Sequence, residues 1–168
     1  DHVFVLNEYD GDELIRRRFY RPDQITVLGV GGGGVDLDRF RREALPADAG
    51  IAMRIELGIP ADVPVIGYLG RVVREKGILD LLQAFTAVSM LIPDAHLVLA
   101  GGTVVGEWDA VDEADMLAAV RHDSDIWSRV HITGFRDDAP NLLTAMDVVV
   151  LPSWREGFGM ALAEAGAM

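Results

Sequence analysis

The sequence has no cysteine and only one lysine, Lys76, among its 15 basic residues. Without cysteine there is no disulfide framework, no thiolate nucleophile and no cysteine-ligated zinc or iron–sulfur site. Acidic residues number 27, and the net charge of -12 argues against a nucleic-acid partner, because phosphates require a basic surface. The apolar runs are far shorter than the roughly 20 residues that a membrane-spanning helix needs. We therefore expect a soluble, cytoplasmic protein.

Half of the 168 residues are hydrophobic, which suffices for the core of one domain or pieces of two. Apolar strand patterns alternate with helical patterns along the chain. Strands that are apolar at every position are typical of a parallel sheet with helices on both faces, which predicts an α/β fold. The predicted strands are residues 3–6, 25–30, 65–69, 96–100, 130–133 and 148–151, and the predicted helices are residues 12–19, 51–57, 78–91, 112–121, 139–146 and 158–168. Because the chain starts at Asp1 and stops inside an apolar helical pattern, we expect it to be a fragment.

Residues 29–34 read GVGGGG, which satisfies the G-x-G-x-x-G pattern of dinucleotide-binding proteins and follows a predicted strand. That site also needs a helix that opens at the third glycine and holds the pyrophosphate at its N-terminus. The following residues up to Gly50 are charged and small, and they include Pro46. A flexible crossing loop is the favoured interpretation, and a nicotinamide or flavin site stays open as an alternative.

A second glycine-containing loop, GRVVREKG at residues 70–77, links a predicted strand to a predicted helix. In open parallel sheets ligands bind beyond the carboxyl ends of strands, and this loop lies at such an end. Gly70 allows close backbone approach, and the Arg71 fork and the Lys76 point charge together suit a diphosphate. The alternative is an ordinary polar loop with solvated charges.

The segment SWREGFGMALAE at residues 153–164 follows the predicted strand 148–151. Gly157 and Gly159 leave the backbone bare at a predicted helix start, where amides can meet phosphate or hydroxyl oxygens. Carboxylates accept two hydrogen bonds from a vicinal diol, so Glu156 and Glu164 suit a sugar or a ribose. Glu164 lies in an otherwise apolar run and should have a partner, unless it marks the solvent side of the helix.

The remaining polar features are weaker signals. Gly101-Gly102 and Gly134-Phe135 follow two further predicted strands and could line a nucleoside pocket, although ordinary turns explain them nearly as well. The four histidines lack the spacing of metal ligands, and His96 and His131 are interpreted as packing or edge residues. The acidic residues between 107 and 115 are interpreted as a solvated loop and a helix start.

Taken together, these segments resemble the retaining, GT-B-fold glycosyltransferases of family 4, also called glycosyl transferases group 1. Residues 70–77 look like the family loop G-R-x-x-x-E-K-G, and residues 152–164 match P-S-x-x-E-G-F-G-x-x-x-x-E, the E-x7-E signature. Residues 34–40, GVDLDRF, are similar to the family crossing segment. The strand ends at 96–102 and 130–135 are similar to two further family motifs, so the resemblance covers nearly the whole chain.

The resemblance implies a Rossmann-like parallel sheet of the GT-B type. Residues 62–168 would form an incomplete C-terminal donor domain, residues 41–61 a linker, and residues 1–40 the last βαβ unit of the N-terminal, acceptor-side domain. The full-length enzyme would be a hexosyltransferase that moves a sugar from a nucleoside-diphosphate sugar to an acceptor hydroxyl with retention of configuration. The acceptor, which could be a sugar, a lipid-linked sugar or a small molecule, would bind the missing domain, so the fragment is expected to be inactive. Oligomeric state and peripheral attachment to the inner membrane face stay open.

The resemblance also implies roles for single residues. Arg71 and Lys76 would bind the diphosphate and Glu156 the sugar hydroxyls, and these three are the candidate catalytic residues. We expect no cofactor and no metal, because a fixed cation pair with helix amides can neutralise the leaving group. The candidate donor-binding residues are Gly70, Arg71, Lys76, Gly134, Phe135, Glu156, Gly157, Phe158, Gly159, Met160 and Glu164, with Gly134 and Phe135 near the base and Glu164 on the ribose.

Three alternatives are kept. One is a nucleotide-sugar binding module without transfer activity. Another is the nicotinamide-dependent oxidoreductase indicated by the glycine run. The third is a nucleotide-sugar epimerase, which the E-x7-E element makes less favourable.

Overall fold

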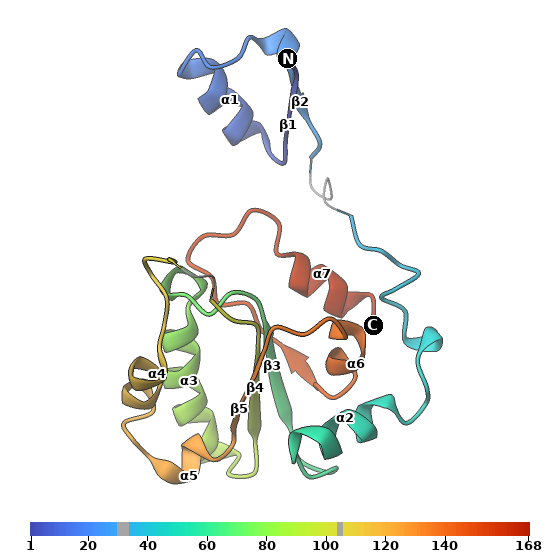
Figure 1. Cartoon of the computed structure of the whole chain (residues 1–168), viewed down its shortest axis with the longest axis vertical. Helices are drawn as coiled ribbons and strands as arrows, with labels where there is room; N and C mark the ends of the chain where they lie inside the picture. The colour runs from blue at the N-terminus through green and yellow to red at the C-terminus, as the bar shows by residue number, and fades with distance from the viewer. Residues whose placement is uncertain (30–33, 104–105) are drawn as a thin grey trace.

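A computed structural model describes residues 1–29, 34–103 and 106–168. The first unit is a βαβ segment, in which strand β1 (Val3–Val5) pairs in parallel with strand β2 (Ile25–Val27). Helix α1 (Glu8–Arg16) connects them, and the 3-10 turn η1 (Pro22–Gln24) precedes β2. Figure 1 shows this unit at one end of the molecule, joined to the rest by a single connection.

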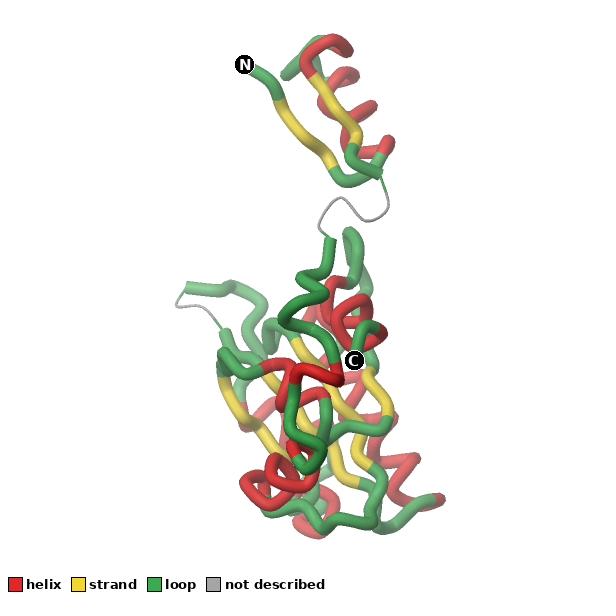
Figure 2. Tube along the Cα trace, turned by 90° about the vertical axis from the view of Figure 1, so that its right-hand side faces the viewer, coloured by secondary structure: helices red, strands yellow, loops and turns green. Residues whose placement is uncertain are grey.

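The second unit has a four-stranded parallel sheet in the order β5-β4-β3-β6. Helices α3 and α4 lie on one side of this sheet and α2 and α6 on the other, and Figure 2 gives a view turned by 90°. The strands are β3 (Val65–Leu69), β4 (His96–Ala100), β5 (Val130–Gly134) and β6 (Val148–Val149). The helices are α2 (Ala49–Leu57), α3 (Ile78–Leu91), α4 (Glu113–Ala119), α5 (Ser124–Trp127), α6 (Ala139–Leu143) and α7 (Met160–Gly166).

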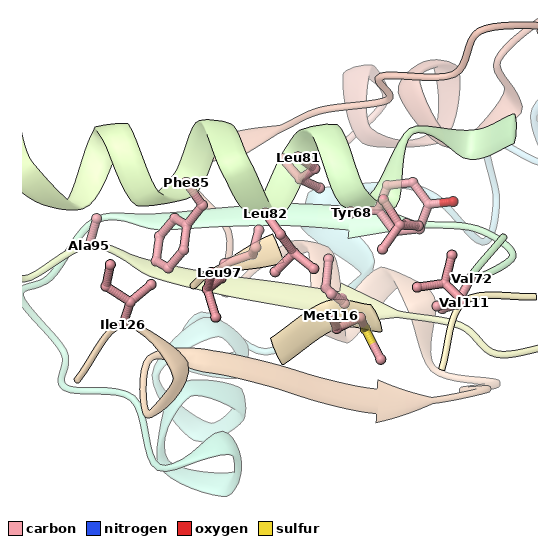
Figure 3. Close-up of a cluster of buried hydrophobic side chains, with 13 residues drawn as sticks. Tyr68, Val72, Leu81, Leu82, Phe85, Ala95, Leu97, Val111, Met116 and Ile126 are labelled. Atoms are coloured by element: carbon pink, nitrogen blue, oxygen red, sulfur yellow. The ribbon is translucent and has the colours of Figure 1, made fainter. Parts of the chain in front are cut away.

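The two faces of strand β4 supply two hydrophobic cores, because successive side chains of a strand point to opposite faces. Leu97 and Leu99 pack in the core beneath α3. Tyr68 of β3 and Phe85 of α3 belong to the same core, and Figure 3 shows this cluster. Val98 belongs to the opposite core together with residues of α2 and α6. All five β4 residues are buried, which confirms the parallel sheet covered on both faces. The carboxyl ends of all four strands therefore reach one common edge.

Arg54 fastens helix α2 to the sheet. Its side chain is only 12% exposed and is paired with Asp147 at 3.0 Å. The remaining guanidinium N–H groups donate to backbone carbonyls of Ala145, Ala61 and Val63. Asp147 in turn accepts from the backbone N–H of Val65 at 2.7 Å, which joins α2, β3 and the start of β6 in one polar network.

His96 and His131 lie side by side at the beginnings of β4 and β5. This placement agrees with their interpretation as packing or edge residues. Their rings are stacked, and Nδ1 of His96 lies 2.8 Å from Nε2 of His131. Burial lowers the pKa of both imidazoles, and for His96 the neighbouring His131 and Arg129 lower it further. The folded state therefore favours the neutral form of this pair.

The element types were predicted well and several boundaries were not. Helix α1 begins at Glu8 instead of residue 12, because the side chain of Asn7 caps it by accepting from the N–H of Asp10. Helix α7 begins at Met160, after Gly159 in a left-handed conformation. The four-residue helix α5 was not predicted, since it is shorter than the span over which helical periodicity becomes visible.

The glycine run falls largely outside the described residues, since positions 30–33 are not among them. After Gly34 the chain forms turns and the short 3-10 helix η2 (Arg42–Ala44) up to Asp48, so no α-helix opens in residues 34–48. The helix that a dinucleotide fingerprint requires is therefore missing from the position next to the run.

Candidate functional site

The loop after β3 is held against the end of β4. The N–H of Gly70 donates to the carbonyl of Ala100, and a Cβ on Gly101 would lie 1.8 Å from the Gly70 carbonyl oxygen. Tyr68, which is fully buried, donates its hydroxyl to the carbonyl of Arg71 at 2.6 Å, and burial raises the pKa of the Tyr68 phenol. The backbone at Arg71 is thus positioned from beneath by a core residue.

Arg71 is paired with two carboxylates. One terminal nitrogen of its guanidinium contacts Glu107, and the other lies 2.7 Å from Glu75. Burial lowers the pKa of the Arg71 guanidinium, but the carboxylates of Glu107 and Glu75 outweigh burial and raise it overall. The charge of Arg71 is consequently balanced by the protein itself.

Lys76 reaches across to the loop that follows β6. Its Nζ lies 2.8 Å from Oε2 of Glu156, and Ser153 donates its hydroxyl to the same carboxylate oxygen at 3.3 Å. The other oxygen accepts from the N–H of Gly157. These contacts, led by the hydrogen bond from Lys76, lower the pKa of the Glu156 carboxyl. The structure therefore brings together two predicted site residues that are 80 positions apart.

The two loops also touch through their backbones. The N–H of Trp154 donates to the carbonyl of Glu75, and the indole N–H of Trp154 donates to Asp80 at 2.7 Å. Gly77 has φ +70°, and a Cβ there would lie 2.2 Å from the carbonyl oxygen of Pro152. This left-handed glycine ends the 3-10 turn η3 (Arg74–Lys76) and starts α3, so it permits the close approach of the loops.

A cavity of about 290 Å³ lies beyond the ends of β3, β4 and β5. Its lining is mostly apolar and includes the predicted residues Gly70, Arg71 and Phe135. Arg136 also lines it, but its guanidinium is held by Asp138 and Glu56 at 2.6 Å each. The exposed Phe135 ring passes so close to Gly102 that a Cβ there would lie 2.9 Å from the ring. The cavity can accommodate a flat, weakly polar group.

A second cavity, of about 330 Å³, contains the other part of the predicted set. It is lined by Glu156, Gly157 and Phe158 on one side and by Leu6, Asn7 and Gly29 of the βαβ unit on the other. Gly159 and Met160 lie at the start of α7 next to it in sequence. The Lys76–Glu156 pair therefore stands next to a space that both units border.

Glu164 lies on α7 and lines neither cavity. Burial raises the pKa of its carboxyl, and the charge of Arg39 opposes this effect. Arg39 lies two positions before the predicted linker, stacks over the ring of Phe40 and donates to the carbonyl of Asp137 at 2.7 Å. Glu164 is thus partly buried, and its charged neighbour comes from the segment just before the predicted linker.

The interpretation of the acidic residues between 107 and 115 is confirmed for the helix start and wrong for the loop. Asp112 caps helix α4, which begins at Glu113, but the loop residues Glu107 and Asp109 are not solvated. The Glu107 side chain is only 13% exposed and Asp109 only 5% exposed. The segment pairs with the loop at residues 70–77. The N–H of Arg74 donates to the carbonyl of Asp109, and the N–H of Val111 donates to the carbonyl of Val72. Neither Glu107 nor Arg39 was singled out as a site residue, because nothing in their local sequence signals a contact with a segment 36 or more positions away.

Within residues 1–29, 34–103 and 106–168, no group of three or more His, Asp or Glu side chains is placed to hold a metal ion. The same residues contain no helix that is long and apolar enough to cross a membrane.

Four parallel strands whose carboxyl ends share one edge, followed by two loops in contact with each other, define an α/β fold of the GT-B type. Comparison with known proteins agrees with this class. Residues 51–168 match the model of the family described as glycosyl transferases group 1, and the chain belongs to that family.

The curated relatives of the chain include bacterial glycosyltransferases. The chain is 36% identical to the D-inositol 3-phosphate glycosyltransferase of Xylanimonas cellulosilytica, over 99% of this chain and 38% of that protein. It resembles the crystal structure of HepE from Anabaena in complex with UDP-glucose, with a TM-score of 0.74 and 25% identity over 99% of this chain and 42% of that one. The structure of the C-terminal domain of LpcC from Francisella tularensis matches with a TM-score of 0.64 and 27% identity, over 80% of this chain and 66% of that one. The chain thus spans about two fifths of the first two proteins.

Proposed function

We propose that the chain forms the donor-binding part of a longer hexosyltransferase, which moves a sugar from a nucleoside-diphosphate sugar to an acceptor hydroxyl with retention of configuration. In this proposal residues 62–168 are donor domain, 41–61 linker and 1–40 the end of the acceptor-side domain. The observation that carries it is the contact between Lys76 and Glu156, which unites a cation for phosphate and a carboxylate for hydroxyls at one sheet edge. The complex of HepE with UDP-glucose supports a nucleotide-sugar ligand.

The proposed chemistry follows from charge. When the glycosidic bond breaks, the nucleoside diphosphate leaves with negative charge, and preorganised donors that meet this charge stabilise the transition state. Arg71, Lys76 and the backbone N–H groups of residues 157–160 supply these donors, so we propose a reaction without metal or cofactor. Glu156 would orient the sugar, and Glu164 would hold the ribose diol. The 290 Å³ cavity next to Phe135 would take the base.

The mutational test uses the complete enzyme. We expect R71A and K76A each to lower kcat/KM for the donor by about 10²–10³-fold, the effect of removing one donor to a developing charge. E156Q should lower kcat, and E164Q should mainly raise the donor KM. R155A is the control for loss of a cation, because Arg155 is an exposed cation in the loop that contains Glu156. Unchanged turnover in R71A and K76A would refute the phosphate roles.

Two further measurements separate this function from the alternatives. Calorimetry with UDP-, GDP- and ADP-sugars against NAD(P) distinguishes a donor site from a nicotinamide site. Transfer of a radiolabelled donor sugar distinguishes an enzyme from a binding module, and the anomeric configuration of the product, read by NMR, tests retention. The 168-residue chain alone should give no transfer.

A further inference from the structure

Arg71 and Lys76, the two cations proposed to bind the diphosphate, are both paired with carboxylates of the protein. Arg71 is shared between Glu75 and Glu107, and Lys76 is paired with Glu156. Two cations against three carboxylates leave this cluster with a formal charge of one negative unit. An incoming diphosphate must therefore compete with carboxylates that belong to the protein.

Glu107 is the least exposed of the three carboxylates, at 13% against 38% for Glu75 and 33% for Glu156. Its segment is attached to the Arg71 loop by the Arg74–Asp109 and Val111–Val72 backbone hydrogen bonds and by a bridge between Val73 and Ala110. Because these anchors follow within four positions of Glu107, its carboxylate has little freedom to leave when a ligand arrives. The negative charge stays near any phosphate bound to Arg71.

We infer that Glu107 is a specificity-determining residue that favours the intact nucleotide sugar over the nucleoside diphosphate product at Arg71. The inference rests on the proposed function. A nucleoside diphosphate carries a terminal phosphate with close to one more negative charge than the esterified diphosphate of the sugar donor, since the second phosphate pKa is about 6. A fixed like charge penalises the more highly charged ligand more strongly. The same carboxylate would thus weaken product binding and speed product release.

Glu156 adds to this selection. While it is paired with Lys76, the ammonium is occupied, and sugar hydroxyls that hydrogen-bond to Glu156 would loosen the pair. Only a ligand that carries the sugar can do this. The bare diphosphate therefore meets both cations in their paired state.

The experiment compares E107Q with wild type in the complete enzyme. UDP, GDP and ADP and their glucose esters are used as probes, and the diphosphate inhibition constant and the donor KM are measured. We expect E107Q to lower the inhibition constant by about tenfold and the donor KM by about threefold or less, on the scale of one charge at close range. E75Q, which removes a more exposed partner of Arg71, should change both in the same direction by a smaller factor. E113Q is the charge-matched control on the exposed start of α4 and should change either constant less than twofold.

Two results overturn the inference. If E107Q raises both constants, Glu107 serves to position Arg71. If the ratio of inhibition constant to KM is unchanged in both E107Q and E75Q, neither carboxylate discriminates between donor and product. R71A separates these outcomes from a failure of the proposed function. If R71A leaves diphosphate binding intact, Arg71 is not a phosphate ligand and both proposals fall, whereas weaker binding in R71A with an unchanged ratio in E107Q refutes only the role of Glu107.

Discussion

Gly77 permits the contact between the two loops, and G77A is the substitution that tests it most directly. Its φ is +70° and ψ +25°, and an added Cβ would lie 2.2 Å from the carbonyl oxygen of Pro152. Gly58 is a matched control with φ +70° and ψ +26° at the end of α2, where an added Cβ meets no atom within 4 Å. The two glycines share a backbone conformation and differ in their surroundings.

The expected magnitudes follow from this difference. A left-handed conformation costs a residue with a Cβ about 1–2 kcal/mol, and this cost applies to both alanine variants. At Gly77 the Cβ must also displace a backbone carbonyl by about 1 Å, and such overpacking costs about 1–3 kcal/mol more. We expect G58A to lower the free energy of unfolding by about 1–2 kcal/mol and G77A by about 2–5 kcal/mol.

The assay is urea unfolding of the chain at 25 °C, with equal m values in the three proteins as the condition for comparison. In the complete enzyme, G77A should also raise the donor KM, because displacement of Pro152 moves the loop that contains Glu156, while G58A should leave the KM unchanged. Equal destabilisation by G77A and G58A would refute the close approach of the two loops.

Three further predictions concern other parts of the structure. The pKa values of His96 and His131 lie below the ordinary 6.5, so the unfolded state binds more protons and stability is lost as pH falls from about 6.5 toward the folded pKa. H131Q should reduce this loss, measured by urea unfolding between about pH 8 and 5. The same dependence of the unfolding free energy on pH in H131Q and wild type would contradict the pairing. R54A should lower the free energy of unfolding by about 2–4 kcal/mol, since it leaves the partly buried carbonyls of Ala145 and Val63 without this donor and removes the ion pair with Asp147; a loss below about 0.5 kcal/mol would exclude a structural role. R39A should raise the pKa of the Glu164 carboxyl further, because it removes the charge that opposes the effect of burial. Carbon-detected NMR titration of this carboxyl measures the change, and an unchanged pKa would show that Arg39 and Glu164 do not interact.

Local patterns were sufficient for most of the secondary structure. Helix α3 and strands β3 and β4 have the predicted bounds, because each combines a long apolar pattern with glycine or proline at its ends. The shorter elements differed, since one side-chain cap such as that of Asn7 moves a helix start by a full turn. Strand β6 covers only Val148–Val149 although four apolar residues suggested a longer strand, because its pairing with β3 extends over two positions.

The sequence by itself determined the family, the parallel α/β architecture and the candidates for the two loops, because glycine, lysine and glutamate at fixed spacing are visible along the chain. The pairing of the charges was decided only by the tertiary structure. Lys76 meets Glu156 and Arg71 meets Glu107 because parallel strands deliver their loops to one edge, whatever their separation in sequence. Arg39 approaches Glu164 from the segment that precedes α2. The lone lysine therefore stood out in the sequence, while the carboxylates that occupy Lys76 and Arg71 became apparent only in the fold.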